Sequence, residues 1–133
     1  MSSTSILENL FLALPSVSDQ HAPGSKLCAL LKQVARREVE NLFYDHDAKS
    51  NEFKPFGDLV FPYHTMGAID SLNLFDLDEL IIFSFYWLNC KRYRRVLDIG
   101  ANIGLHSIIL SKCGFEVCAY EPDPQHFEIL QRI

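Results

Sequence analysis

The stretch VLDIGANIG, residues 96–104, places an apolar run and an aspartate directly before two glycines and an asparagine. This pattern is typical of a β-strand that turns sharply into a helix, because glycine and asparagine tolerate the left-handed backbone of a tight turn. The flanking residues continue the alternation, and Gly114 is expected to close the first helix. The predicted elements are a strand at residues 95–99, a helix at 103–112, a strand at 116–120 and the start of another helix at 125–133.

A strand, a crossover helix and a second strand within this length form a βαβ unit, in which the two strands are parallel. Their nearly continuous apolar character predicts strands that are covered on both faces. We therefore expect an α/β fold, the start of a Rossmann-like doubly wound parallel sheet. Two strands are too few for such a sheet, so the chain is expected to be the N-terminal part of a longer protein or to need partner strands.

The preceding sequence is expected to form a mainly helical segment. Residues 1–70 are assigned to an N-terminal extension with a short β element, and residues 71–133 to the first part of the Rossmann-like domain. The predicted elements of the extension are a helix at 5–14, a linker at 15–25, an amphipathic helix at 26–44, a polar loop at 44–52, a turn at Gly57 and Asp58, and a strand at 59–61. A helix capped by Asp76 or Asp78 follows, and its apolar character predicts burial on several sides.

Composition limits the classes of partner. The net charge of −5 gives no electrostatic footprint for nucleic acid or for an anionic membrane. The longest apolar run, residues 80–88, is about half of what a bilayer requires, and the N-terminus lacks the basic start of a signal peptide. We expect a cytoplasmic protein that binds neither nucleic acid nor a membrane.

The cysteines show no metal-binding pattern. None of the four forms a CxxC pair, and no histidine cluster stands beside them at zinc-like spacing. Buried, reduced thiols are the favoured interpretation for Cys28, Cys90, Cys113 and Cys118, and no metal site is expected.

A strand that feeds a glycine turn and a helix is a general nucleotide-binding device, and its details select the ligand. A dinucleotide fingerprint has glycine at its first, third and sixth positions. Counted from Gly100, the third and sixth positions are Asn102 and Leu105, and the Asp98 carboxylate would repel a pyrophosphate. A dinucleotide oxidoreductase is therefore the weakest of the hypotheses.

S-adenosylmethionine fits the same residues better, because its sulfur and its ammonium group are cationic. Asp98 can attract that end, while the helix start near Ile103 can accept the methionine carboxylate. Glu121 directly follows the second strand, where an acidic residue can take both ribose hydroxyls. The turn at residues 122–124 could flank the adenine. The alternative is a structural βα turn with an acidic tip.

Residues 95–133 resemble the opening of class I S-adenosylmethionine-dependent methyltransferases. Their DIGANIG turn and YEPDP strand end look most like those of the FkbM family. The resemblance implies S-adenosylmethionine as cofactor and methyl transfer to a hydroxyl of a small-molecule or glycan acceptor, such as a sugar or a natural-product-like compound. It also implies contacts with the methionine half from Asp98, Gly100, Asn102 and Gly104, with the ribose from Glu121, and near the adenine from Asp123.

The sequence leaves the catalytic residue unknown. His106 follows the glycine turn, but a histidine packed against a neighbouring element is the favoured interpretation, and His64 is a second candidate for the base. The alternative to an enzyme is a non-catalytic, methyltransferase-like binding or oligomerisation module, which would form a homo-oligomer.

Overall fold

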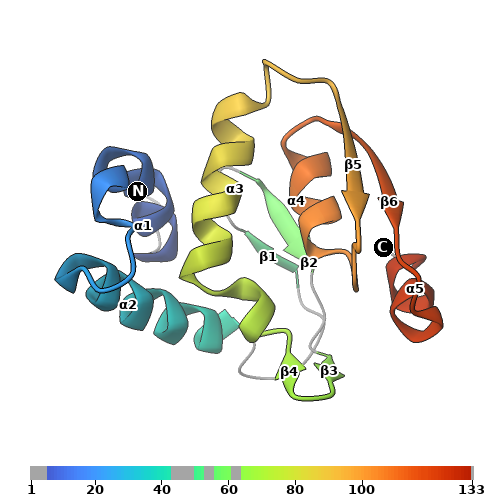
Figure 1. The fold of residues 1–133 in the computed structure, drawn as a ribbon, viewed down its shortest axis with the longest axis horizontal. Helices are drawn as coiled ribbons and strands as arrows, with labels where there is room; N and C mark the ends of the chain where they lie inside the picture. Colours follow the sequence, from blue (N-terminus) through green and yellow to red (C-terminus); the bar gives the residue numbers. More distant parts are fainter. Residues whose placement is uncertain (1–5, 43–49, 53–55, 61–63, 133) are drawn as a thin grey trace. The chain divides into compact units, whose positions relative to one another are not determined.

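The computed structural model describes residues 6–42, 50–52, 56–60 and 64–132 (Figure 1). The chain is a mixture of helices and strands, as expected, and its described part includes a two-stranded parallel sheet. The chain divides into two compact units, Met1–Ser84 and Phe85–Ile133. The expected boundary between residues 70 and 71 stays a prediction.

Helices dominate the start of the first unit: α1 (Ile6–Ala13), the 3₁₀ helix η1 (Leu14–Gln20) and α2 (Lys26–Leu42). The predicted linker at 15–25 is wrong over the 3₁₀ helix. Pro15 lies in the first turn of η1, where its missing N–H costs nothing, so the proline begins a new helix instead of a loop. The buried apolar side chains of these helices are Leu7, Leu10, Phe11, Leu14, Ala35 and Val39.

Two short antiparallel pairs follow in the same unit: β1 (Ser50–Glu52) with β2 (Asp58–Val60), and β3 (Thr65–Met66) with β4 (Ile69–Asp70). The predicted polar loop is wrong at residues 50–52, which pair with β2 through their backbones. Gly57 has φ +75° directly before β2, which agrees with the expected turn at this residue, whereas Asp58, the other predicted turn residue, is the first residue of β2. Phe56 packs edge-on against Phe11, with ring centroids 5.1 Å apart.

Helix α3 (Leu77–Asn89) follows the short 3₁₀ helix η2 (Asn73–Phe75). Of the two candidate caps, Asp76 directly precedes the helix, and its carbonyl accepts a hydrogen bond from the Leu80 N–H at 3.0 Å, whereas Asp78 lies within the helix. The Asp76 Oδ1 also accepts a hydrogen bond from the Leu77 N–H at 2.7 Å. The expected burial on several sides is wrong, because the side chains of Phe85 and Leu88 are 59% and 64% exposed. Apolar composition produces burial only where another element covers the face. The buried positions form one stripe: Leu77, Leu80, Phe83 and Ser84.

The second unit contains the strand–helix–strand arrangement: β5 (Arg95–Ile99), α4 (Leu105–Lys112), β6 (Glu116–Tyr120) and α5 (Pro124–Leu130) (Figure 1). Strands β5 and β6 are parallel, with Arg95 opposite Glu116 and Ile99 opposite Tyr120. Both strands have the predicted bounds and the predicted direction, so this expectation is confirmed.

The end of α4 is also as expected. Gly114 has φ +94°, and its N–H donates to the carbonyl of Ser111 at 3.0 Å. The next N–H, from Phe115, reaches back to the carbonyl of Leu110 at 3.2 Å. These two bonds form a Schellman motif, which requires a left-handed residue and therefore favours glycine.

The two faces of the parallel sheet differ. Helix α4 packs against both strands, and the alternate side chains of Val96, Asp98, Val117 and Ala119 are half-buried. The other face exposes apolar groups, because Leu97 is 65% and Ile99 is 79% exposed. The expectation that both faces are covered is thus wrong for the described residues, which provide one covering helix layer. None of the helices in the described ranges is long and apolar enough to cross a membrane.

Candidate functional site

The glycine turn between β5 and α4 is built on left-handed backbone conformations. Gly100, Asn102 and Gly104 have φ values of +78°, +54° and +94°. The N–H groups of Gly100 and Ala101 both donate to the carbonyl of Tyr120, at 2.8 and 3.0 Å. The turn is therefore tied to the end of β6. Gly104 is the N-cap of α4, so the helix begins two residues after the predicted start at 103, because left-handed residues cannot continue a right-handed helix.

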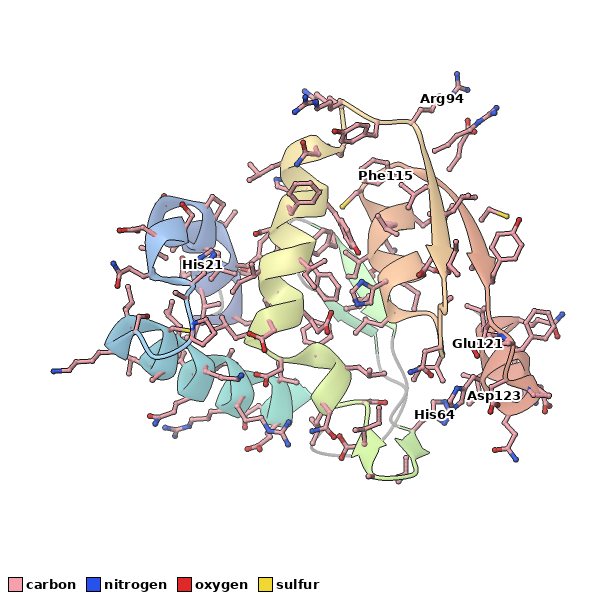
Figure 2. All side chains as sticks on the ribbon, in the orientation of Figure 1. His21, His64, Arg94, Phe115, Glu121 and Asp123 are labelled. Atoms are coloured by element: carbon pink, nitrogen blue, oxygen red, sulfur yellow. The ribbon has the colours of Figure 1, made fainter. Side chains whose placement is uncertain are left out.

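The Glu121 side chain forms hydrogen bonds with both turns that follow the parallel strands. Its Oε2 accepts a hydrogen bond from the Asn102 N–H at 2.6 Å, and its Oε1 accepts one from the Asp123 N–H at 2.8 Å. Figure 2 shows Glu121 and Asp123 close together at the start of α5. Each carboxylate oxygen has two lone pairs, so each can accept a further hydrogen bond. The carboxylate is held in a fixed orientation and retains acceptor capacity.

Asp123 caps α5. Its Oδ1 accepts hydrogen bonds from the N–H groups of Gln125 and His126, at 2.9 and 3.1 Å, and Pro124 occupies the first turn. The backbone hydrogen bonds from His126 and Gln125 lower the pKa of the Asp123 carboxyl below its usual value. Aspartate followed by proline is a common start of a helix, so this role was visible in the sequence. The expected place of Asp123 near an adenine stays a prediction.

Asp98, the acidic residue of β5, is half-buried on the face that α4 covers. Its Oδ2 accepts a hydrogen bond from the hydroxyl of Ser107 at 2.6 Å. Ser107 lies in the first turn of α4, and sequence reasoning missed it. No motif links the two residues, and only the position of the helix start brings the hydroxyl to the carboxylate.

The turn also offers room and an unused hydrogen-bond acceptor. The Oδ1 atom of Asn102 is buried and has no hydrogen-bond partner among the described residues. A buried polar atom without a partner costs about 1–3 kcal/mol, so such an atom in a native fold calls for an explanation. At Gly100, no described atom other than those of the glycine and its two chain neighbours lies within 4 Å of where a Cβ would stand. The Gly100 side of the turn is therefore open to an approaching molecule.

The two candidate histidines belong to different units. In the second unit, the His106 Nδ1 lies 2.9 Å from the hydroxyl of Tyr86, and the two rings meet edge to face. This contact agrees with a histidine packed against a neighbouring element. In the first unit, the backbone N–H of His64 donates to the Ser71 hydroxyl at 2.8 Å. A catalytic role for either histidine stays a prediction.

All four cysteines are free thiols, and Cys113 is buried. Burial, with a smaller effect of Cys90, raises the pKa of the Cys113 thiol to about 11. Cys118 on β6 is exposed, so the expectation of buried cysteines is wrong there. Within the described ranges, no group of three or more histidine, cysteine, aspartate or glutamate side chains could hold a metal ion.

The six predicted site residues thus lie at the carboxyl ends of two adjacent parallel strands and in the turns that follow them. Hydrogen bonds connect Glu121 with Asn102 and with Asp123, while the Asp98 carboxylate is hydrogen-bonded to the Ser107 hydroxyl instead. Contact of these residues with a cofactor stays a prediction, as does the resemblance to the FkbM family. In comparisons with known proteins, no family model, no curated protein and no solved structure matches the chain.

Proposed function

We propose that the chain forms the S-adenosylmethionine-binding start of a Rossmann-like methyltransferase of the FkbM type. The enzyme would methylate a hydroxyl of a small-molecule or glycan acceptor, such as a sugar or a natural-product-like compound, in the cytoplasm. The observation that carries the proposal is the Glu121 carboxylate. Both of its oxygens are oriented by backbone N–H groups, one from the glycine turn and one from the start of α5.

The chemistry of the turn suits an adenosine cofactor with a cationic end. The ribose offers two neighbouring hydroxyls, and a pre-oriented carboxylate such as that of Glu121 can accept a hydrogen bond from each. Asp98 provides a second carboxylate, which suits an ammonium group and opposes a pyrophosphate. The residues present therefore fit S-adenosylmethionine better than a dinucleotide.

The reaction would be an in-line displacement. A hydroxyl oxygen of the acceptor forms a bond to the methyl carbon while the bond from that carbon to sulfur breaks, and the sulfonium leaves as a neutral thioether. The hydroxyl proton passes to a base, for which no residue is assigned. The cofactor supplies the activated methyl group, and the residues of this chain bind and orient it.

The test is cofactor binding by the 133-residue chain, measured by isothermal titration calorimetry with S-adenosylmethionine. Glu121→Ala is expected to weaken binding at least about tenfold, because it removes two hydrogen bonds to a charged group. Glu128→Ala is the matched control, since Glu128 is an exposed glutamate of α5 that pairs with Arg132. Unchanged affinity in Glu121→Ala would contradict the site. A chain that binds NAD(P) and not S-adenosylmethionine would favour the oxidoreductase.

A second candidate is the non-catalytic binding or oligomerisation module. The exposed face of the β5–β6 sheet favours it, because Leu97 and Ile99 remain 65% and 79% exposed. The module would be a stable homo-oligomer, which multi-angle light scattering detects. A monomer across a wide concentration range, combined with S-adenosylmethionine binding, would exclude it.

A further inference from the structure

We infer that Ser107 is a positioning residue, which fixes the Asp98 carboxylate in the orientation that receives the ammonium of S-adenosylmethionine. This inference rests on the proposed function. The observation behind it is the hydrogen bond of 2.6 Å from the Ser107 hydroxyl to the Asp98 Oδ2, which is short, as expected for a hydroxyl that donates to a carboxylate.

The hydroxyl of Ser107 is used in an unusual way for a serine within a helix. Such a hydroxyl commonly donates to the carbonyl three or four residues earlier. Ser84 in α3 does so, with its Oγ 2.7 Å from the carbonyl oxygen of Ile81. Ser107 donates to another element instead and links the first turn of α4 to β5. The helix does not need this hydrogen bond, so we expect the bond mainly to orient the Asp98 carboxylate.

Helix α4 is a firm support for that bond. Its Ile109 side chain is fully buried, and the Schellman motif closes its end at Gly114. Opposite Asp98 in the sheet stands Ala119, a residue with a small side chain. The hydroxyl is therefore held in place by the fold, and it restricts the rotation of the Asp98 side chain.

This hydrogen bond also makes the two oxygens of the Asp98 carboxylate different. Oδ2 receives the hydroxyl, while Oδ1 has no hydrogen-bond partner among the residues that the structure describes. An ammonium group binds more tightly to a carboxylate that is already oriented, because the conformational entropy of that side chain has been lost before binding. Ser107 should thus affect only ligands that carry the amino-acid end.

The experiment compares two ligands on the 133-residue chain by calorimetry. S-adenosylmethionine carries the ammonium, whereas 5′-methylthioadenosine keeps the adenosine and the sulfur and lacks the amino-acid end. Ser107→Ala should weaken S-adenosylmethionine about three- to tenfold, the equivalent of one ordinary hydrogen bond, and leave 5′-methylthioadenosine unchanged. Ser107→Thr, which keeps the hydroxyl, should restore the affinity. Ser111→Ala, on the exposed part of the same helix, is the control.

The outcomes separate the inference from the proposed function. If the unmodified chain binds neither ligand, the proposed function fails. If it binds both and Ser107→Ala weakens both equally, Ser107 has a structural role only and the inference is overturned. Unchanged binding of S-adenosylmethionine in Ser107→Ala overturns it as well, as does failure of Ser107→Thr to restore affinity while the variant remains folded.

Discussion

Glu121 should stabilise the second unit even without a ligand. Its carboxylate accepts one bond from the half-buried Asn102 N–H and another from the exposed Asp123 N–H. Glu121→Ala removes both acceptors and leaves two donors. Water can reach the Asp123 N–H, so the loss there is small. The Asn102 N–H lies in a tight turn, where a replacement partner is harder to place.

The expected loss of stability in Glu121→Ala follows from the environments of the Asn102 and Asp123 N–H groups. A hydrogen bond to a charged group contributes about 1.5–3 kcal/mol when it is partly buried, and an exposed bond contributes about 0.5 kcal/mol. Glu121→Ala should therefore lower the free energy of unfolding by about 2–3.5 kcal/mol, a large share of the stability of a small domain. Glu121→Gln retains one acceptor oxygen and should fall between Glu121→Ala and the unmodified chain.

Urea unfolding followed by tryptophan fluorescence measures this cost. Trp87 is the single tryptophan of the chain, it belongs to the second unit, and it is 36% exposed. With an ordinary urea dependence, the midpoint should fall by about 1–2 M and the slope should not change. Glu128→Ala, which breaks an exposed pair, should cost at most about 0.5 kcal/mol. A cost for Glu121→Ala no larger than that of this control would show that the two hydrogen bonds to the Glu121 carboxylate do not stabilise the second unit.

Three further outcomes are expected. The fold depresses the pKa of Asp123, so its contribution to stability is complete above the usual value of 3.8 and is lost as the pH falls through the lower, folded value. Urea unfolding across acidic pH should show this loss in the unmodified chain and not in Asp123→Ala, and identical acid dependence would contradict it. Iodoacetamide at about pH 8 should label Cys118 well before Cys113, whose pKa is raised to about 11, and equal labelling in peptide mass spectrometry would argue against this. Gly100→Ala should cost about 1–2 kcal/mol in urea unfolding because φ is +78°, although space surrounds the position, and a cost near zero would exclude backbone strain there.

The sequence was most informative where the signal is local. The two parallel strands followed from apolar runs and their spacing, and Gly114 followed from the conformational needs of a helix end. The cap at Asp76 was found as one of two candidates. In each case, a few neighbouring residues decide the structure, so no knowledge of the remaining chain was required.

Features that depend on distant residues were missed. The exposure of Leu97 depends on which elements cover the sheet, and an apolar run is the same whether one face or both are covered. The strand at residues 50–52 forms through its pairing with β2 and has a polar composition. Ser107 became visible only when the helix start was located, because its partner Asp98 lies on another element.

The register of the parallel sheet has a kinetic consequence. Every residue of β5 is paired with the residue 21 positions later, as in Arg95 with Glu116 (116 − 95 = 21). Parallel pairing usually requires long loops to close, which slows folding. Here the closure spans a single helix that itself forms in about a microsecond. The strand–helix–strand segment can therefore assemble from contacts that are close in sequence, early in folding and before any more distant pairing.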